Sequence, residues 1–146
     1  MRIEAIWLPE VQQQVYRSLM EVMSRPGKVE SLAEIIEQSS PARAVLATVL
    51  DAEVSLCDHH DLLEANDWPL LQAENKRVEQ ADYILCLGNK SPDFEPKLGE
   101  LSSPEYSATI ILQVDSVSEG DCQFNLSGPG VDGQKTVSIT GLNPDW

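Results

Sequence analysis

Residues 83–87 read Tyr-Ile-Leu-Cys-Leu, a continuous apolar run that Gly88 and Asn89 bring to an end. A strand with one solvated face alternates apolar and polar residues, so this unbroken run predicts a strand covered on both faces. A strand of that kind needs packed layers on each side of its sheet. With 146 residues, the chain is predicted to be a single α/β domain over residues 1–146, with a mixed sheet and flanking helices.

Helices are predicted mainly in the first half of the chain. The clearest spans residues 10–24, where Val11, Val15, Leu19, Val22 and Met23 recur on one helical face after Pro9. The segment Arg25-Pro26-Gly27 ends it, because proline disfavours the helical conformation of the preceding residue and glycine tolerates the turn. Three more helical segments are expected: a short helix or turn containing Leu32, Ile35 and Ile36, a largely buried helix over 42–50, and one over 70–80.

The remaining segments are predicted to be strands and loops. Residues 89–105 contain three prolines and a glycine, which favours a loop. Turns are expected at Glu119-Gly120-Asp121 and at Gly128-Pro129-Gly130. Besides 83–87, the predicted strands are 54–57, 108–114, 122–126 and 135–140.

The chain is strongly acidic, with 24 acidic and 10 basic side chains and a formal net charge of −14. Such a field repels nucleic acid, anionic lipid and free phosphorylated metabolites, so neither nucleic acid nor a membrane is an expected partner. No apolar run approaches the roughly 20 residues that span a bilayer. The first four residues, Met1 to Glu4, do not resemble the start of a signal peptide, and a cytoplasmic location is expected.

The glycines at 128, 130 and 133 match the spacing G-x-G-x-x-G. A dinucleotide-binding loop needs this motif between a strand and a helix, where backbone N–H groups meet the pyrophosphate. Here Pro129 removes one N–H group, and residues 136–140 are typical of a strand. We therefore interpret the segment as a glycine-rich hairpin turn and predict no cofactor.

The densest group of potential metal ligands is Asp58-His59-His60-Asp61, which follows Cys57. Adjacent residues of a helix or strand point in different directions, so His59 and His60 are poorly placed to share an ion. A structural zinc site needs four good ligands, and these are the only two histidines. A solvated polar loop is the favoured interpretation, His59 and His60 remain weak candidates, and a subunit interface could still complete a site.

Motifs for nucleophilic catalysis are missing from the sequence. There is no G-x-S-x-G segment, the five lysines carry no sign of Schiff-base chemistry, and nothing distinguishes one carboxylate from another. The cysteines 57, 86 and 122 are widely spaced and are interpreted as reduced. We predict no catalytic residues and no metal within this chain, which favours a role as a subunit of a larger assembly.

Two stretches resemble PhnH, a subunit family of the bacterial carbon–phosphorus lyase system for phosphonate breakdown. Residues 15–29 are similar to that family's opening helix and its methionine-x-x-proline-glycine stop. Residues 107–117, followed by Gly120, residues 126–131 and Gly141-Leu142, are similar to a second series in the same order and spacing. Between these stretches, residues 47–56 and 81–87 also fit, so the resemblance covers about residues 10–143. Each motif alone is weak, whereas the ordered set is specific.

The resemblance implies a fold like the large domain of pyridoxal-phosphate-dependent transferases, without the cofactor. It implies a complex with the PhnG, PhnI and PhnJ subunits, together with self-association as a homodimer. In that system PhnG, PhnH, PhnI and PhnL support the transfer of an alkylphosphonate onto the ribose of a nucleoside triphosphate. PhnJ, a radical enzyme that uses S-adenosylmethionine and an iron–sulfur cluster, then breaks the carbon–phosphorus bond. No catalytic residue is carried over from the family.

Members of the family usually continue beyond the glycine-leucine pair with a further helix and strand, whereas this sequence stops at Trp146. An edge of the sheet is therefore expected to be exposed or covered by a partner. Two other functions stay open at this point. One is a stand-alone oligomeric binding or regulatory protein with a PhnH-like fold, and the other is a metal-dependent hydrolase that uses residues 58–61.

Overall fold

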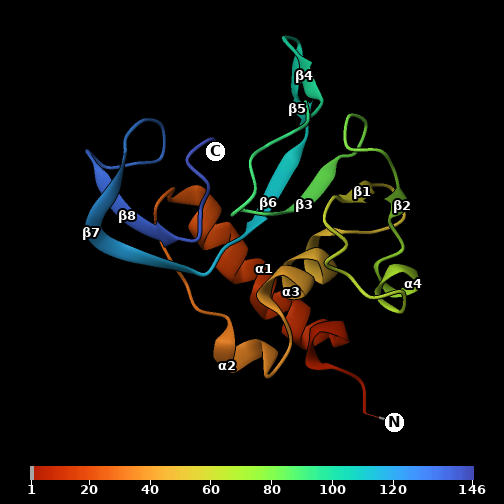
Figure 1. Ribbon diagram of the computed structural model, residues 1–146. Helices are drawn as coiled ribbons and strands as arrows, with labels where there is room; N and C mark the ends of the chain where they lie inside the picture. The colour runs from red at the N-terminus through yellow and green to blue at the C-terminus, as the bar shows by residue number, and fades with distance from the viewer. Residues whose placement is uncertain (1) are drawn as a thin grey trace. The chain divides into compact units, whose positions relative to one another are not determined.

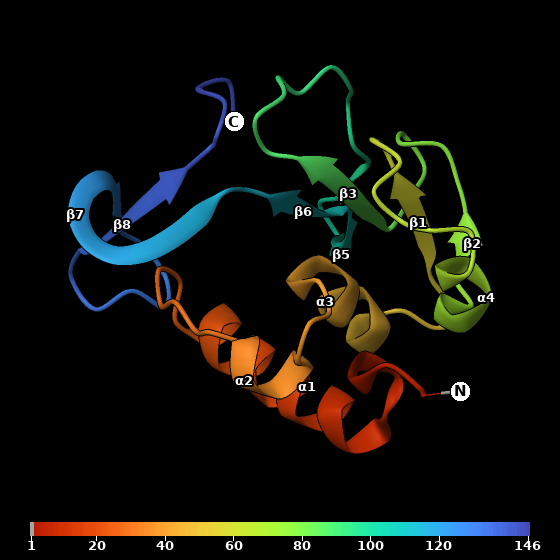
Figure 2. The ribbon, with the colours of Figure 1, turned by 60° about the horizontal axis from the view of Figure 1, so that its bottom comes forward.

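The apolar run at residues 83–87 forms strand β3 (Tyr83–Leu87), which lies inside a four-stranded sheet in the computed structural model. The sheet has the strand order β2-β1-β3-β6, and every pair in it is parallel (Figure 2). The other strands are β1 (Ser55–Asp58), β2 (Glu74–Asn75) and β6 (Thr109–Gln113). Ile84, Leu85 and Cys86 are fully shielded from solvent, which confirms the prediction of a strand covered on both faces.

The structure describes residues 2–146, apart from the side chains of residues 120–123. Two compact units are formed, and each is described by itself. The helical unit consists of Met1–Thr48 and Val114–Leu142, and the sheet unit consists of Val49–Gln113 and Asn143–Trp146. The expectation of a single domain over residues 1–146 stays a prediction.

The core of the sheet unit lies against β3. One cluster of buried side chains there consists of Val78, Ala81, Ile84 and Cys86. Partly buried apolar side chains pack against them, from Cys57, Phe94, Ala108, Ile110, Leu112 and Trp146. Segments far apart in the sequence therefore meet over the central strand of the sheet.

The helical unit contains a 3₁₀ turn, η1 (Ala5–Trp7), and the helices α1 (Pro9–Ser24), α2 (Ala33–Ile36) and α3 (Pro41–Val49) (Figure 1). Their positions confirm the three predicted helical segments in the first 50 residues. Helix α1 begins with Pro9, where the missing N–H group has no cost. The buried side chains of this unit include a cluster of Ala5, Ile6, Val11, Val15, Ile36 and Ala44.

The helical unit also contains an antiparallel ribbon of β7 (Ser116–Leu126) and β8 (Lys135–Thr140). Between the two strands, Gly128 and Gly130 adopt positive φ angles of 122° and 83°. Gly27 adopts a φ angle of 91°, where helix α1 has ended. The strand that follows the glycine series shows that G-x-G-x-x-G here lies in a hairpin connection rather than before a helix.

The prediction of a helix over 70–80 is wrong. Helix α4 is short (Asp67–Leu71), and Gln72 closes it in the left-handed conformation with a φ angle of 62°. The chain then pairs with β1 through the two-residue strand β2. Val78 is buried, but in an irregular segment, so its spacing from Leu71 reflects separate contacts with the core rather than a helical face.

Two loop and turn predictions also need correction. Residues 89–105 were expected to be a loop, but β4 (Leu98–Glu100) and β5 (Ser103–Ser107) form an antiparallel hairpin. No turn occurs at residues 119–121, because β7 continues through them with a shift of register between Glu119 and Phe124. The expected mixed sheet is likewise separated into one parallel sheet and two antiparallel ribbons. Composition alone does not distinguish a loop from a short exposed hairpin, and the course of β7 is set by its pairing with β8 further along the chain.

We expect Gly130→Val to lower the free energy of unfolding by about 1 kcal/mol or more. A Cβ atom at this position would lie 3.1 Å from Cδ of Pro26 and 3.3 Å from the carbonyl oxygen of Ser24, in addition to the unfavourable φ angle. Gly133→Val is the matched control, because Gly133 has a φ angle of 70° but no atom within 4 Å of such a Cβ. Urea unfolding measures both variants. An unchanged midpoint for Gly130→Val would show that this turn does not need glycine.

Among the described residues, no helix is both long and apolar enough to cross a membrane.

Candidate functional site

The strand order of the parallel sheet identifies one edge as a candidate site. From β1 the chain passes to β2 on one side and then returns to β3 on the other, so the connections diverge at the carboxyl ends of β1 and β3. In open α/β sheets, ligands bind in the crevice at such a switch point. Asp58 ends β1 at this edge, and His59 and His60 follow it directly. The two histidines singled out in the sequence therefore lie at the place where an α/β sheet positions functional groups.

His59 pairs with a carboxylate that is distant in the sequence. Its Nε2 atom lies 2.8 Å from Oδ1 of Asp93, and the Phe94 ring packs edge-on against the imidazole with 4.8 Å between centroids. The hydrogen bond from His59 holds the pKa of Asp93 below its ordinary value. The sequence offered no signal for this His–Asp pair, because 34 residues separate its members.

The side chain of His60 is hydrogen-bonded to the backbone of the central strand β3. Its Nδ1 atom accepts a hydrogen bond of 3.0 Å from the backbone N–H group of Leu87, so the proton of the neutral ring lies on Nε2. Burial lowers the pKa of His60, and the neighbouring His59 and Lys90 lower it further, against opposing effects of Asp93 and Asp58. His60 therefore supports the end of β3 in its neutral form.

The group at residues 57–61 does not converge on a common point. The His59 and His60 rings meet edge to face, with 4.7 Å between centroids, and Asp58 accepts hydrogen bonds from the N–H groups of Leu62 and Leu63. Within the described part of the chain, no three His, Cys, Asp or Glu side chains gather as a metal-binding group. His59 and His60 thus have protein partners of their own in this structure.

The described cysteines do not resemble activated nucleophiles. Cys57 and Cys86 are free thiols. Burial raises the pKa of Cys57, and it raises the pKa of Cys86 to about 12. A thiol with a raised pKa is mostly protonated at neutral pH and reacts slowly. The side chain of Cys122 lies outside the described residues.

We expect the stability of the wild-type chain, relative to His60→Asn, to fall as the pH drops below about 6.5. The pKa of His60 is lower in the folded state than its ordinary value of 6.5, so the unfolded state binds the proton more readily. The stabilisation by neutral His60 is complete above that value and is lost as the pH falls toward the folded pKa. Asparagine can place an oxygen near the position of Nδ1 without titrating.

Urea unfolding between about pH 5 and pH 8 measures this difference. His60→Ala is the companion variant, because it leaves the N–H group of Leu87 without its acceptor and should cost about 1–3 kcal/mol throughout that range. A difference between wild type and His60→Asn that does not change with pH would contradict the assignment of a neutral His60.

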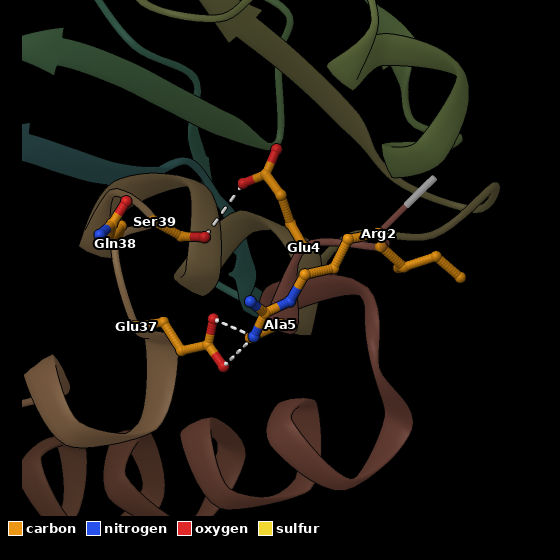
Figure 3. A pocket seen from close by; sticks show the side chains of 7 residues that line it. Arg2, Glu4, Ala5, Glu37, Gln38 and Ser39 are labelled. Atoms are coloured by element: carbon orange, nitrogen blue, oxygen red, sulfur yellow. Dashed lines mark hydrogen bonds and ion pairs between the residues drawn. The ribbon is translucent and has the colours of Figure 1, made fainter.

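A cavity of about 430 Å³ lies beside the N-terminal segment of the helical unit. Figure 3 shows Arg2 reaching across it to both carboxylate oxygens of Glu37, at 3.2 Å each, while Glu4 accepts a hydrogen bond of 3.0 Å from Ser39. Arg43 donates to both oxygens of Glu4, at 2.8 and 3.0 Å, and these bonds hold the pKa of Glu4 below its ordinary value. The charged groups of this cavity satisfy one another, which indicates an anchor for the N-terminal segment rather than a ligand site.

A groove of about 510 Å³ lies where the turn after α1 meets the β7–β8 connection. A Cβ atom at Gly27 would lie 2.7 Å from Cγ of Lys135, so only glycine allows this approach. The groove is lined by Arg25, Pro26, Lys28, Glu119, Gly130, Val131, Asp132 and Lys135. Each of its basic side chains has a carboxylate partner: Glu21 lies 2.6 Å from Arg25 and 2.8 Å from Lys28, and Glu119 lies 3.6 Å from Lys135.

This groove explains the turn residues selected from the sequence. Gly130 packs on Pro26, and Gly27 packs on Lys135 and Leu126, so two motifs about 100 residues apart form one contact. Pro129 lies between the two glycines of the second turn. The groove is therefore a packing contact between the turn after α1 and the β7–β8 connection, and its basic side chains are paired with carboxylates.

Comparison with known proteins gives a clear relationship. Residues 6–146 match the family described as bacterial phosphonate metabolism protein (PhnH). A protein of Stutzerimonas stutzeri named "Putative C-P lyase subunit protein HtxG" is 34% identical over 141 residues, which cover 97% of this chain and 71% of that protein. The resemblance found in the sequence motifs is thereby confirmed along nearly the whole chain.

Proposed function

This chain belongs to the PhnH family of bacterial phosphonate metabolism proteins, and from that premise we propose that it is a subunit of a cytoplasmic carbon–phosphorus lyase core complex. In that role it supports the transfer of an alkylphosphonate to the ribose of a nucleoside triphosphate. The observation that carries the proposal is the family match over residues 6–146, together with a relative named as a lyase subunit.

The site geometry supports a subunit role rather than independent catalysis. His60 is bound to the backbone of Leu87, His59 is paired with Asp93, and the thiols of Cys57 and Cys86 have raised pKa values. The charged side chains of the cavity beside the N-terminal segment and of the groove at the β7–β8 connection are paired with one another and are likewise interpreted as structural. Chemistry on the phosphonate is therefore assigned to the other subunits, with PhnG, PhnI and PhnJ as the proposed partners. A core like that of the pyridoxal-phosphate-dependent transferases, without the cofactor, is the corresponding proposal for the fold.

Co-purification tests this function most directly. The tagged chain is co-expressed with PhnG, PhnI and PhnJ from the same source, and a stable stoichiometric complex is expected. The molar mass of the chain on its own reports whether it also self-associates. If the chain purifies alone while the other subunits assemble without it, a stand-alone binding or regulatory protein with a PhnH-like fold becomes the better description.

Growth provides an independent test. Deletion of the gene should abolish growth on methylphosphonate as the sole phosphorus source in a strain without a second copy, and growth on phosphate should remain. Normal growth of the deletion strain on methylphosphonate would exclude the proposed role.

A further inference from the structure

The β4–β5 hairpin of the sheet unit carries the two most exposed large apolar side chains among the described residues, Leu101 and Leu98, together with an exposed tyrosine. Leu101 at its tip is fully exposed, at 106%, Leu98 is 82% exposed and Tyr106 is 63% exposed. The hairpin pairs only with itself, as a separate two-stranded ribbon. Figure 1 shows it standing away from the parallel sheet of the same unit.

The stability of the folded chain does not explain why these exposed side chains are apolar. A two-stranded hairpin alone is marginally stable in water, and it is normally stabilised by burying an apolar face. Here every residue of β4 is exposed, as are all residues of β5 except the half-buried Ser103. The apolar groups of the hairpin therefore contribute little to the core, and their exposure marks an interaction surface.

The backbone conformation of the hairpin nevertheless depends on particular residues. Gly99 has a φ angle of 74°, and a Cβ atom there would lie 2.9 Å from the backbone nitrogen of Ser107. Glu100 pairs with Ser103, so Leu101 and Ser102 form a two-residue turn. Turns of this length favour glycine, asparagine and aspartate, whereas here a leucine occupies the apex. Leucine at this turn departs from the usual preference without adding to the core, and such departures are expected at functional sites.

The charges around the apolar side chains indicate what kind of partner fits. Glu100 and Glu105 lie on the hairpin and Glu95 precedes it in the chain; all three are exposed, and within the described part of the chain none of them is paired with a basic side chain. Lys97, the basic residue of this segment, is bound to Asp82. The hairpin thus carries exposed apolar side chains, at its tip and its base, among unpaired carboxylates. A second copy would bring the same carboxylates together on a chain of net charge −14, which opposes self-pairing through this element.

We propose that the β4–β5 hairpin is the element by which this chain docks onto a different, basic polypeptide of its assembly. Leu98, Leu101 and Tyr106 pack against apolar surface of that partner, and lysine or arginine side chains around that surface face Glu95, Glu100 and Glu105. Aromatic and large apolar anchors that become fully buried dominate the affinity of protein interfaces, and charges at the rim set orientation and association rate. This inference rests on the proposed function as a lyase subunit.

The test measures binding of the purified full-length chain to a PhnG–PhnI–PhnJ complex prepared without it. The hairpin variant carries Leu98→Thr, Leu101→Asn and Tyr106→Thr, which keep strand and turn propensity while removing the anchors. Its dissociation constant should rise by at least about a hundredfold, since buried anchors commonly contribute about tenfold each. Its melting temperature should stay within a few degrees of wild type, because these side chains lie outside the core.

The control variant replaces exposed apolar residues elsewhere, as Ile3→Thr, Met23→Thr and Leu70→Asn, and should bind as wild type does. A second variant with Glu95, Glu100 and Glu105 changed to glutamine should bind more weakly at low salt and depend less on salt. Wild-type affinity of the hairpin variant would overturn the inference and leave the proposed function intact. Absence of binding by the wild-type chain would overturn both. Loss of a homodimer with unchanged complex formation would assign the hairpin to self-association and refute the docking proposal.

Discussion

Ile84→Ala is expected to lower the free energy of unfolding by about 4 kcal/mol. Ile84 lies in the middle of β3, with Cys57 opposite it on β1 and Ile110 opposite it on β6. Its side chain is fully buried in the core of the sheet unit. Truncation removes apolar contacts and leaves a cavity in the core on this face of the sheet, which the surrounding side chains fill only in part.

Urea unfolding followed by circular dichroism measures this effect. Leu70→Ala is the matched control in the same unit, because Leu70 is more than half exposed and should contribute less than about 1 kcal/mol. Equal effects of the two substitutions would show that β3 does not form the centre of the core.

Asp82→Ala is expected to lower the free energy of unfolding by about 3 kcal/mol. One carboxylate oxygen of Asp82 accepts hydrogen bonds from the backbone N–H group and the hydroxyl group of Ser55, at 2.9 and 2.8 Å. The other oxygen accepts a hydrogen bond from Lys97. Ser55 is buried, so removal of the carboxylate leaves its backbone N–H group without a partner at the start of β1. The carboxylate thus holds the amino ends of β1 and β3 together.

The same carboxylate predicts a loss of stability in acid. Burial alone would raise the pKa of Asp82, but the bonds from Lys97 and Ser55 outweigh it and hold the pKa below its ordinary value of 3.8. The stabilisation is therefore complete above that value and is lost as the pH falls through the lower pKa of the folded state. Asp82→Asn should abolish this part of the pH dependence.

The control for both Asp82 variants is Glu74→Ala. The ion pair of Glu74 with Lys76 is exposed and 3.4 Å long, and its loss should change stability by less than about 0.5 kcal/mol. If Asp82→Ala were as mild as this control, the carboxylate would be a surface group rather than a link between two strands.

Local sequence patterns predicted correctly those elements whose conformation depends mainly on residues within the same short segment. The apolar run of β3, the one-sided spacing of α1 and the glycines of the β7–β8 connection each place a physical requirement on a short segment. The helix expected over 70–80 failed for the complementary reason. Leu71 and Val78 are both buried, but Gln72 ends the helix and a pairing with β1 takes over.

The functional conclusions also came partly from the sequence and partly from the structure. The ordered motifs in the sequence identified the PhnH family, and the comparison over residues 6–146 confirmed it. The candidate pair of histidines was visible as a local cluster, whereas the partner of His59 was not, because Asp93 approaches it only through folding of the sheet unit. Likewise, the sequence placed Leu98 and Leu101 in a loop, with no sign that a hairpin presents them to solvent.

The sequence by itself therefore determined the family, the α/β class, the central buried strand and the turns that need glycine, since each depends on residues close together in the chain or on their fixed order. The tertiary structure alone decided the parallel register of β1, β3 and β6, the bonds of Asp82 and the His59–Asp93 pair. These features join segments up to tens of residues apart. Their free energy comes from pairing and burial between distant groups, which no local pattern encodes.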